Sequence, residues 1–203
     1  MKRLGSIIVF EGPDSIGKST ISEGALQSLQ NCGVQCVLFS FPGKEKGTLG
    51  KLVYEMHHKP RKFGIKSISH AALQTMHVAA HLDALENRII PCLEVGKTVI
   101  LDRWWWSTFV YGSVFGVDQS LLKALIKAEL TLLDGIKPSV VYLVSRPSPF
   151  DKRVESQQWR QLVIGYRKLA RSEEKKCKVR IVRNDRPIPE VVNQILKELL
   201  SSN

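Results

Sequence analysis

The chain has 203 residues, of which 43% are hydrophobic, and it carries a formal net charge of +11. This size suffices for one hydrophobic core, and we expect a single domain over residues 1–203. The positive charge predicts an anionic partner, a nucleotide or a nucleic acid, and no stretch approaches the roughly 20 apolar residues that would span a bilayer.

The cysteines and the first residues bear on the compartment. Cys32, Cys36, Cys92 and Cys177 are scattered, without C-x-x-C pairs and without the density of a secreted disulfide scaffold. The opening MKRLGSIIVFEGP contains an apolar run that Glu11 cuts short, and no small-residue cleavage site follows it. We therefore expect a reduced, cytoplasmic protein with no membrane association, whose first apolar run is a strand.

Hydrophobic periodicity alternates along the chain between short strands and longer helices. The predicted strands lie at residues 6–11, 35–41, 98–101, 140–144 and 179–182, and the predicted helices at 18–31, 49–56, 69–92, 121–133, 159–171 and 190–200. Short buried strands that alternate with helices form a parallel sheet covered on both faces. The predicted fold class is therefore α/β, in three layers with about five strands, and ligands should bind at the carboxyl ends of the strands.

The strongest motif follows the first predicted strand. The sequence there reads G-x-x-x-x-G-K-S between a strand and a helix, the context that separates phosphate loops from chance matches. Its glycines let backbone N–H groups point at phosphate oxygens, while Lys18 would neutralise the β and γ phosphates and the Ser19 hydroxyl would ligate magnesium. The segment predicts binding of ATP and Mg²⁺ by Gly12, Pro13, Asp14, Ser15, Ile16, Gly17, Lys18, Ser19 and Thr20.

Two further segments follow predicted strands. Asp102 and Arg103 end the third strand, where Asp102 can accept a hydrogen bond from a magnesium-bound water and Arg103 can hold a phosphate bidentately. Phe41 and Lys44 follow the second strand, where Phe41 would line a base pocket and Lys44 would hold the phosphate of an acceptor. Each segment also has a plainer interpretation, as a surface ion pair in the first case and a solvated loop lysine in the second.

Over most of the chain these motifs resemble the thymidylate kinase family of nucleoside monophosphate kinases. IIVFEGPDSIGKST, SFPGKEKGTLGKLV and ENRIIPCLEVGKTVILDRWWWST are similar to that family's phosphate loop, its Phe-Pro segment and its Asp-Arg strand. The resemblance implies a P-loop NTPase fold with a short lid near residues 146–156. It also implies transfer of the γ-phosphoryl group of ATP to a nucleoside monophosphate, either dTMP or a related nucleotide, with a diphosphate as product.

The resemblance carries roles over residue by residue. Asp14 would contact the acceptor sugar or orient its phosphate, and Lys44 with Arg103 would hold that phosphate. Lys18 and a lid arginine, Arg153 in the first place, would stabilise the transferring group without a covalent nucleophile. The implied substrate-binding residues are Phe41, Lys44, Arg103, Trp104, Ser107 and Tyr111.

The base site and the lid depart from the family pattern. Counting back from Pro91 along the long helix places Val78 and Leu82 where the family has a base-stacking phenylalanine and a base-reading arginine. Arg146 lies where the family has an aspartate after the fourth strand, and is the second candidate for the lid arginine. Three polar residues are alternative base readers, unless they are ordinary core or surface residues: Gln74, His77 and His81.

The run Trp104-Trp105-Trp106 is close to the predicted acceptor site. Consecutive side chains on a helix point roughly 100° apart, so at most two of the three can face a ligand. We expect Trp104 in the pocket or the core, and the other two in packing or in a subunit interface.

Two other functions are open at this point. A kinase of a nucleoside or another small hydroxyl compound would need a carboxylate base, for which Glu11 and Asp14 are candidates. A nucleotide-regulated nucleic-acid-binding protein would explain the charge, the tryptophan run and the excess of Lys and Arg between Asp151 and Arg186, although a solvated basic helix explains that excess as well. We expect a nucleoside monophosphate as the main partner, and a homodimer.

Overall fold

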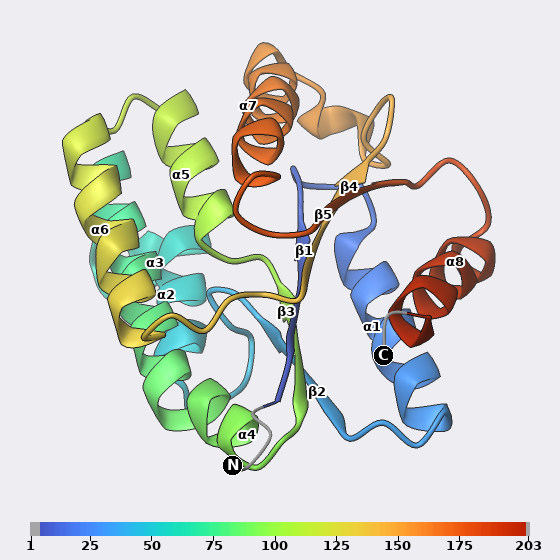
Figure 1. The fold of residues 1–203 in the computed structure, drawn as a ribbon. Helices are drawn as coiled ribbons and strands as arrows, with labels where there is room; N and C mark the ends of the chain where they lie inside the picture. The colour runs from blue at the N-terminus through green and yellow to red at the C-terminus, as the bar shows by residue number, and fades with distance from the viewer. Residues whose placement is uncertain (1–4, 202–203) are drawn as a thin grey trace.

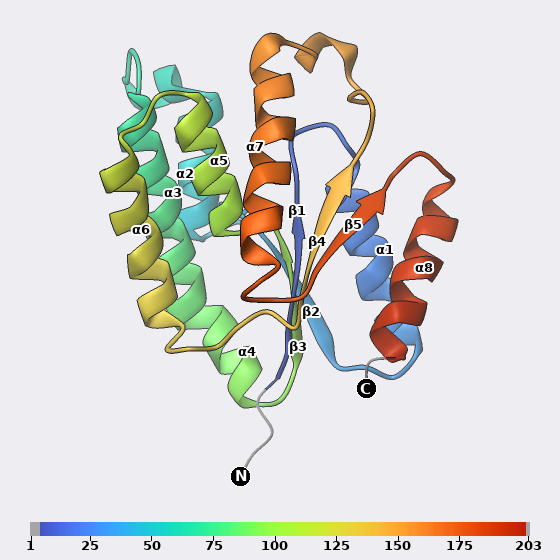
Figure 2. The ribbon, with the colours of Figure 1, turned by 45° about the horizontal axis from the view of Figure 1, so that its top comes forward.

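The structure is a computed structural model that describes residues 5–201. Within that range one parallel sheet has the strand order β2-β3-β1-β4-β5. Helices cover both of its faces, which gives the three predicted layers (Figures 1 and 2). The strands are β1 (Ile7–Glu11), β2 (Cys36–Ser40), β3 (Thr98–Asp102), β4 (Val140–Ser145) and β5 (Val179–Arg183).

Helices on the two faces come from different parts of the chain. The first and last helices, α1 (Lys18–Asn31) and α8 (Ile188–Leu200), pack side by side on one face (Figure 2). The other face is covered by α3 (His70–Ala84), α4 (Ile90–Glu94), α5 (Trp105–Val114), α6 (Gln119–Leu132) and α7 (Gln157–Glu173), and α2 (Leu49–His58) packs against α3. Among the described residues no helix is long and apolar enough to cross a membrane.

The central strands β1, β3 and β4 are mainly apolar because each face of the sheet has its own core, whereas the edge strand β5 exposes Arg180, Ile181 and Arg183. Ile7 and Val9 of β1 join the core beneath α3 to α7, while Ile8 and Phe10 join the core beneath α1 and α8. Successive strand residues point to opposite faces, so a strand covered on both faces is buried at every position. All five residues of β1 are buried accordingly.

The predicted helix over 69–92 is interrupted. Between α3 and α4 the five residues Leu85–Ile89 form a π-helical turn, and Pro91 lies in the first turn of α4 rather than in the last turn of a continuous helix. A π turn inserts one extra residue into a helix. Side chains before the turn therefore do not lie where a regular count back from Pro91 places them.

The helix α5 is missing from the predicted helices. Its sequence, WWSTFVYGSV, is rich in aromatic and β-branched residues and glycine, which are weak helix formers. The helix is supported instead by packing, since it contacts α3, α6 and α7. Local propensity could not have placed it.

The carboxyl ends of the central strands bring the sequence motifs together. Asp102 at the end of β3 is level with Phe10 of β1 and with Ser40 of β2. The phosphate loop follows β1, and the loop that contains Phe41 follows β2. A site for ligands at this edge of the sheet is the arrangement expected of open α/β folds.

Candidate active site

The phosphate loop takes a conformation that requires its glycines. Gly12 and Gly17 have φ angles of 140° and 86°. A Cβ atom at Gly12 would lie 2.7 Å from the carbonyl oxygen of Val144, and one at Gly17 would lie 2.4 Å from Nδ2 of Asn184. Gly17 also directly precedes Lys18, the first residue of α1, so the loop ends at a helix N-terminus, where N–H groups and the helix dipole attract phosphate.

Lys18 is held inside the loop. Its side chain is buried, and Nζ donates a hydrogen bond to the carbonyl oxygen of Pro13 at 2.5 Å. Burial, with a smaller contribution from Arg103, lowers the pKa of Lys18 to about 7, while neighbouring carboxylates oppose the shift. A bound polyphosphate would favour the charged amine, since an anion stabilises a nearby cation.

Ser19 and Asp102, the two residues predicted to hold magnesium, are adjacent in the structure. The Oγ of Ser19 donates to Oδ2 of Asp102 at 2.5 Å, while Oδ1 of Asp102 is buried and has no hydrogen-bond partner among the described residues. A carboxylate oxygen in that state suits a cation or its water ligand. The described residues contain no cluster of three or more His, Cys, Asp and Glu that could form an all-protein metal site.

Arg103 connects the phosphate loop to the predicted acceptor site. It has a φ of 76°, a conformation that is unfavourable for a residue with a side chain. Its Nη1 donates to the carbonyl oxygen of Gly12 at 3.2 Å and to Oγ of Ser107 at 3.0 Å, and its Nη2 is paired with Asp14. The hydroxyl of Tyr111 donates to the other oxygen of Asp14 at 2.6 Å. Burial by itself would raise the pKa of the Asp14 carboxyl. The charge of Arg103 opposes this effect and holds the pKa below its usual value.

Glu11 supports the start of α5. It is fully buried, and its Oε1 accepts hydrogen bonds from the backbone N–H of Trp104 at 2.8 Å and of Ser107 at 3.2 Å, while Oε2 accepts from Oγ of Ser107 at 2.7 Å. Burial raises its pKa to about 7. Because both oxygens are occupied at a helix N-terminus, Glu11 is not placed to take a proton from an acceptor hydroxyl.

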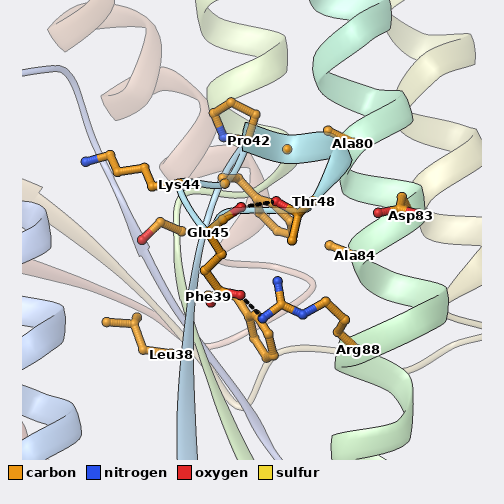
Figure 3. A pocket seen from close by; sticks show the side chains of 14 residues that line it. Leu38, Phe39, Pro42, Lys44, Glu45, Thr48, Ala80, Asp83, Ala84 and Arg88 are labelled. Atoms are coloured by element: carbon orange, nitrogen blue, oxygen red, sulfur yellow. Dashed lines mark hydrogen bonds and ion pairs between the residues drawn. The ribbon is translucent and has the colours of Figure 1, made fainter. Parts of the chain in front are cut away.

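The two site residues predicted in the loop after β2 differ in burial. Phe41 is buried, with its ring 4.2 Å from the ring of His81. Lys44 is exposed and extends away from the α3 side of the pocket that this loop forms with α3 (Figure 3). Its Nζ lies 5.9 Å from the ring of Tyr54. Arg88 pairs with Glu45 across the same pocket and fixes the loop to the helical layer.

The predicted lid lies on the phosphate loop. The backbone N–H of Phe150 donates to the carbonyl oxygen of Ser15 at 2.7 Å, and that of Asp151 donates to Oγ of Ser15 at 2.8 Å. Arg153 pairs with Asp151 at 2.8 Å and its side chain is 90% exposed, while the guanidinium of Arg146 stacks on the ring of Phe150 at 3.9 Å. In this conformation the side chain of Arg153 donates to Asp151, and Nη1 of Arg146 donates to the carbonyl oxygen of Asn184 at 2.6 Å.

The three tryptophans are all buried. Trp104, Trp105 and Trp106 are 2%, 9% and 1% exposed and belong to the core beneath α3 to α7. Trp104, predicted to line a pocket or the core, is thus a core residue, although its Nε1 has no hydrogen-bond partner among the described residues. The tryptophans cannot stack on the bases of a single strand or form a subunit interface without unpacking that core.

Comparisons with known proteins agree with this geometry. The family model described as thymidylate kinase matches residues 10–195. The chain belongs to the thymidylate kinase family. It is 31% identical to a "Probable thymidylate kinase" of Thermococcus kodakarensis, with 93% of this chain and 94% of the relative covered. It is 32% identical to a "Thymidylate kinase" of Symbiobacterium thermophilum, with 95% and 93% covered.

The fold is that of a solved thymidylate kinase. The structure of the enzyme from Ehrlichia chaffeensis superposes with a TM-score of 0.76 at 22% sequence identity, covering 96% of this chain and 98% of that chain. The predicted P-loop NTPase fold is thereby confirmed. As a member of the thymidylate kinase family, the protein is a nucleoside monophosphate kinase with ATP as co-substrate and a nucleotide as acceptor.

Some residues that shape this thymidylate kinase family site were not predicted from the sequence. Asn184 lies directly after β5, and its Nδ2 donates to the carbonyl oxygen of Ile16 at 2.7 Å. Its backbone N–H donates to the carbonyl oxygen of Ser145 at 2.9 Å. The indole of Trp159 donates to the carbonyl oxygen of Asp14 at 3.1 Å. The available signal for Asn184 was a polar residue directly after the last predicted strand.

Proposed function

We propose that the protein transfers the γ-phosphoryl group of ATP to dTMP and releases dTDP and ADP. The observation that carries this proposal is the position of Arg103, whose guanidinium contacts Gly12 and Asp14 of the phosphate loop, the second being the residue to which the family resemblance gives an acceptor contact. If Asp14 contacts the acceptor, Arg103 lies where it can hold donor and acceptor phosphates in line. The names of the relatives support dTMP as the acceptor.

In this proposal Lys18 and the loop N–H groups hold the β and γ phosphates of ATP. Ser19 and Asp102 would hold Mg²⁺, which neutralises phosphate charge when bound, and the buried Oδ1 of Asp102 without a partner fits that role. The hydroxyl of Ser19, now donating to Asp102, would turn its lone pairs toward the ion.

On the acceptor side, Arg103 would hold the acceptor phosphate, and Lys44 would join it after turning inward. Asp14, kept ionised by Arg103, would accept a hydrogen bond from a hydroxyl of the acceptor sugar. Phe41 would border the base, and Ser107 and Tyr111 would hold Arg103 and Asp14 in place. Proton removal by the protein is unnecessary, since a phosphate acceptor already carries negative oxygens.

The proposal extends to the lid, the assembly and the compartment. A single domain over residues 1–203 would close its lid, residues 146–156, over the donor, with Arg153 or Arg146 stabilising the transferring group. We propose a homodimer, and sedimentation analysis would test it. The free cysteines support a cytoplasmic location.

Initial rates with ATP and Mg²⁺ test the function. We expect diphosphate formation from dTMP, and none from thymidine, because Arg103 needs a phosphate to hold and Glu11 is not available as a base. A protein that phosphorylates thymidine but not dTMP would contradict the proposal in favour of a nucleoside kinase, as would a lack of turnover with every nucleoside monophosphate.

A further inference from the structure

The two faces of α7 differ in chemistry. The inner face packs on α5 and β4 and reaches the active site, where the indole of Trp159 donates to Asp14 and the hydroxyl of Tyr166 lies 2.7 Å from Oγ of Ser107. On the opposite side, residues that recur every three or four positions form one continuous face. We define the basic outer face of α7 as the exposed residues Arg160, Ile164, Arg167, Lys168, Arg171 and Lys175.

The five cations of this face have no acidic partner. Among residues 5–201 their side chains form no ion pair and no hydrogen bond, whereas cations on either side of α7 are paired, Arg153 with Asp151 and Lys176 with Glu173. The sequence shows why, since it contains no Asp or Glu between Glu155 and Glu173. The positive charge of the basic outer face is therefore not neutralised within the described part of the protein.

The cations also repel one another. Arg171 is four residues from both Arg167 and Lys175 and three residues from Lys168. Residues at these spacings are neighbours on a helix surface, and like charges there destabilise the helix. An acidic residue at position 171 would attract all three neighbours instead. The helix thus has a cluster that lowers its own stability, and an anionic partner would remove the repulsion.

The shape of the face indicates a long anion. From Arg160 to Lys175 it extends about 22 Å, at about 1.5 Å per residue, so a single phosphate group cannot contact all five cations. Three of the five are arginines, whose planar guanidinium can hold phosphate oxygens in pairs. A nucleic-acid duplex carries one negative charge per about 1.7 Å of its axis and is straight over this length. A row of phosphates therefore matches the row of cations.

Other polyanionic partners fit this face less well. Ile164, at 64% exposure, is the one large apolar side chain of α7 that the described structure exposes. A helix that binds a membrane surface needs a whole apolar face, and a protein partner needs several apolar or aromatic anchors. A single strand of nucleic acid stacks its bases on exposed aromatic rings, but Trp159 and Tyr166 are buried.

We propose that the basic outer face of α7 binds the phosphate backbone of double-stranded DNA without reading its sequence. Duplex RNA is recognised largely through its 2′-hydroxyls and its A-form shape, for which a straight row of cations has no dedicated contacts. Because the active site lies at the inner face, the protein can hold a duplex and its nucleotides together. The binding is independent of which acceptor the enzyme phosphorylates.

Fluorescence anisotropy with a labelled DNA duplex of about 20 base pairs tests the binding. Each cation that contacts a phosphate contributes about −0.9 to the slope of log K against log salt, so five contacts predict a slope of up to about −4.5. The affinity should fall at least about 100-fold between about 50 and 200 mM salt, and unrelated sequences should bind alike. A Kd weaker than about 100 μM at the lower salt concentration, or a marked preference for one sequence, would overturn the proposal.

A pair of charge reversals tests the location. The double variant Arg167→Glu, Arg171→Glu should bind DNA at least about tenfold more weakly, with a salt slope reduced by about two. Its Tm should stay unchanged or rise, since like-charge pairs are removed. The matched control is Lys123→Glu, Lys127→Glu on the exposed side of α6, which α5 separates from α7 (Figure 2). This control loses the same net charge and should bind almost as the wild type does; an equal loss in both would overturn the assignment to α7.

Competition with the bound duplex identifies the partner. Polyglutamate and vesicles of anionic lipid, added at equal charge, should displace the duplex at least about tenfold less well than unlabelled DNA does, because neither offers so dense a row of charge. Equal displacement by either would overturn DNA in favour of an acidic protein or a membrane surface. Stronger displacement by duplex RNA would also contradict the proposal. ATP with dTMP should leave the duplex bound, and its release would place the DNA in the active site instead.

Discussion

The phosphate loop and the residues Gln74 and His77 of α3 differ in how far their polar groups find hydrogen-bond partners within the protein. In the loop, Lys18 donates to Pro13, Ser19 donates to Asp102, and Asn184 holds the carbonyl group of Ile16. One side-chain oxygen of Asp102 and one of Asn184 are nevertheless buried without a partner in the described part of the chain, as are polar atoms of Gln74 and His77. The loop therefore has partners for its amine and its hydroxyl before any ligand binds, while Gln74 and His77 each keep an unpaired polar atom.

The largest expected effect is on the donor side. In Lys18→Met, kcat should fall by about 100-fold to 1,000-fold, because a positive group aimed at the transferring phosphoryl is lost. The ligand-free Tm should not fall, since an amine whose pKa is already lowered to about 7 by burial gives way to an apolar chain. Steady-state kinetics and thermal unfolding check both points, with the exposed Lys46→Met as the control. A Tm that falls as steeply as kcat would mean that Lys18 mainly stabilises the loop.

Arg103 contacts the phosphate loop and α5, and its replacement sharpens the comparison. In Arg103→Lys the single amine cannot contact Gly12, Ser107 and Asp14 together, so kcat/KM for dTMP should fall about 10-fold to 100-fold. The KM for ATP should change less than that for dTMP. The exposed Arg61→Lys is the matched control. A loss confined to the KM for ATP would place Arg103 on the donor side alone.

The buried carboxyl of Glu11 gives an effect on stability that depends on pH. Burial raises its pKa from 4.5 to about 7, so between these values the folded protein binds a proton that the unfolded chain has released. The stability contributed by the protonated group is complete below pH 4.5 and is lost as the pH rises to 7. The free energy of unfolding of the wild type, minus that of Glu11→Gln, should fall over this interval in urea titrations. A difference that does not change with pH would contradict the raised pKa.

The smallest effect should come from the basic outer face of α7, which belongs to neither region. Arg167 and Arg171 line a shallow depression there together with Lys168 and Lys175. Replacing both arginines by glutamate should leave kcat/KM for dTMP within about twofold, as surface charges far from a site usually do. A large loss of turnover would show that the positive surface contributes to catalysis after all.

The phosphate loop could be predicted from the sequence because its structure is local. Gly12, Gly17 and Lys18 lie within seven consecutive residues, and their contacts are with the loop itself or with the ends of adjoining strands. Asp102 was predictable for a related reason. It ends a buried strand, and the carboxyl ends of parallel strands meet at the edge of the sheet where ligands bind. The order of strands and helices followed from the same hydrophobic pattern.

The acceptor side could not be predicted in the same way because its contacts are distant in sequence. His81 meets Glu129 across 48 residues, and Glu11 supports a helix that begins more than 90 residues later. The π-helical turn at Leu85–Ile89 leaves no clear pattern in the sequence, and it shifts the register of every side chain before it. The lid arginine remains a prediction, since Arg153 and Arg146 both make contacts within the lid.

The most direct test of the account is a competition among acceptors. The protein would receive ATP, Mg²⁺ and equal concentrations of dTMP, dCMP, dAMP and dGMP, and phosphorus NMR with chromatography would identify the diphosphates over time. We predict that dTDP forms first, together with an equal amount of ADP. Preferential formation of another diphosphate, or release of ADP and phosphate with no new nucleoside diphosphate, would contradict the account.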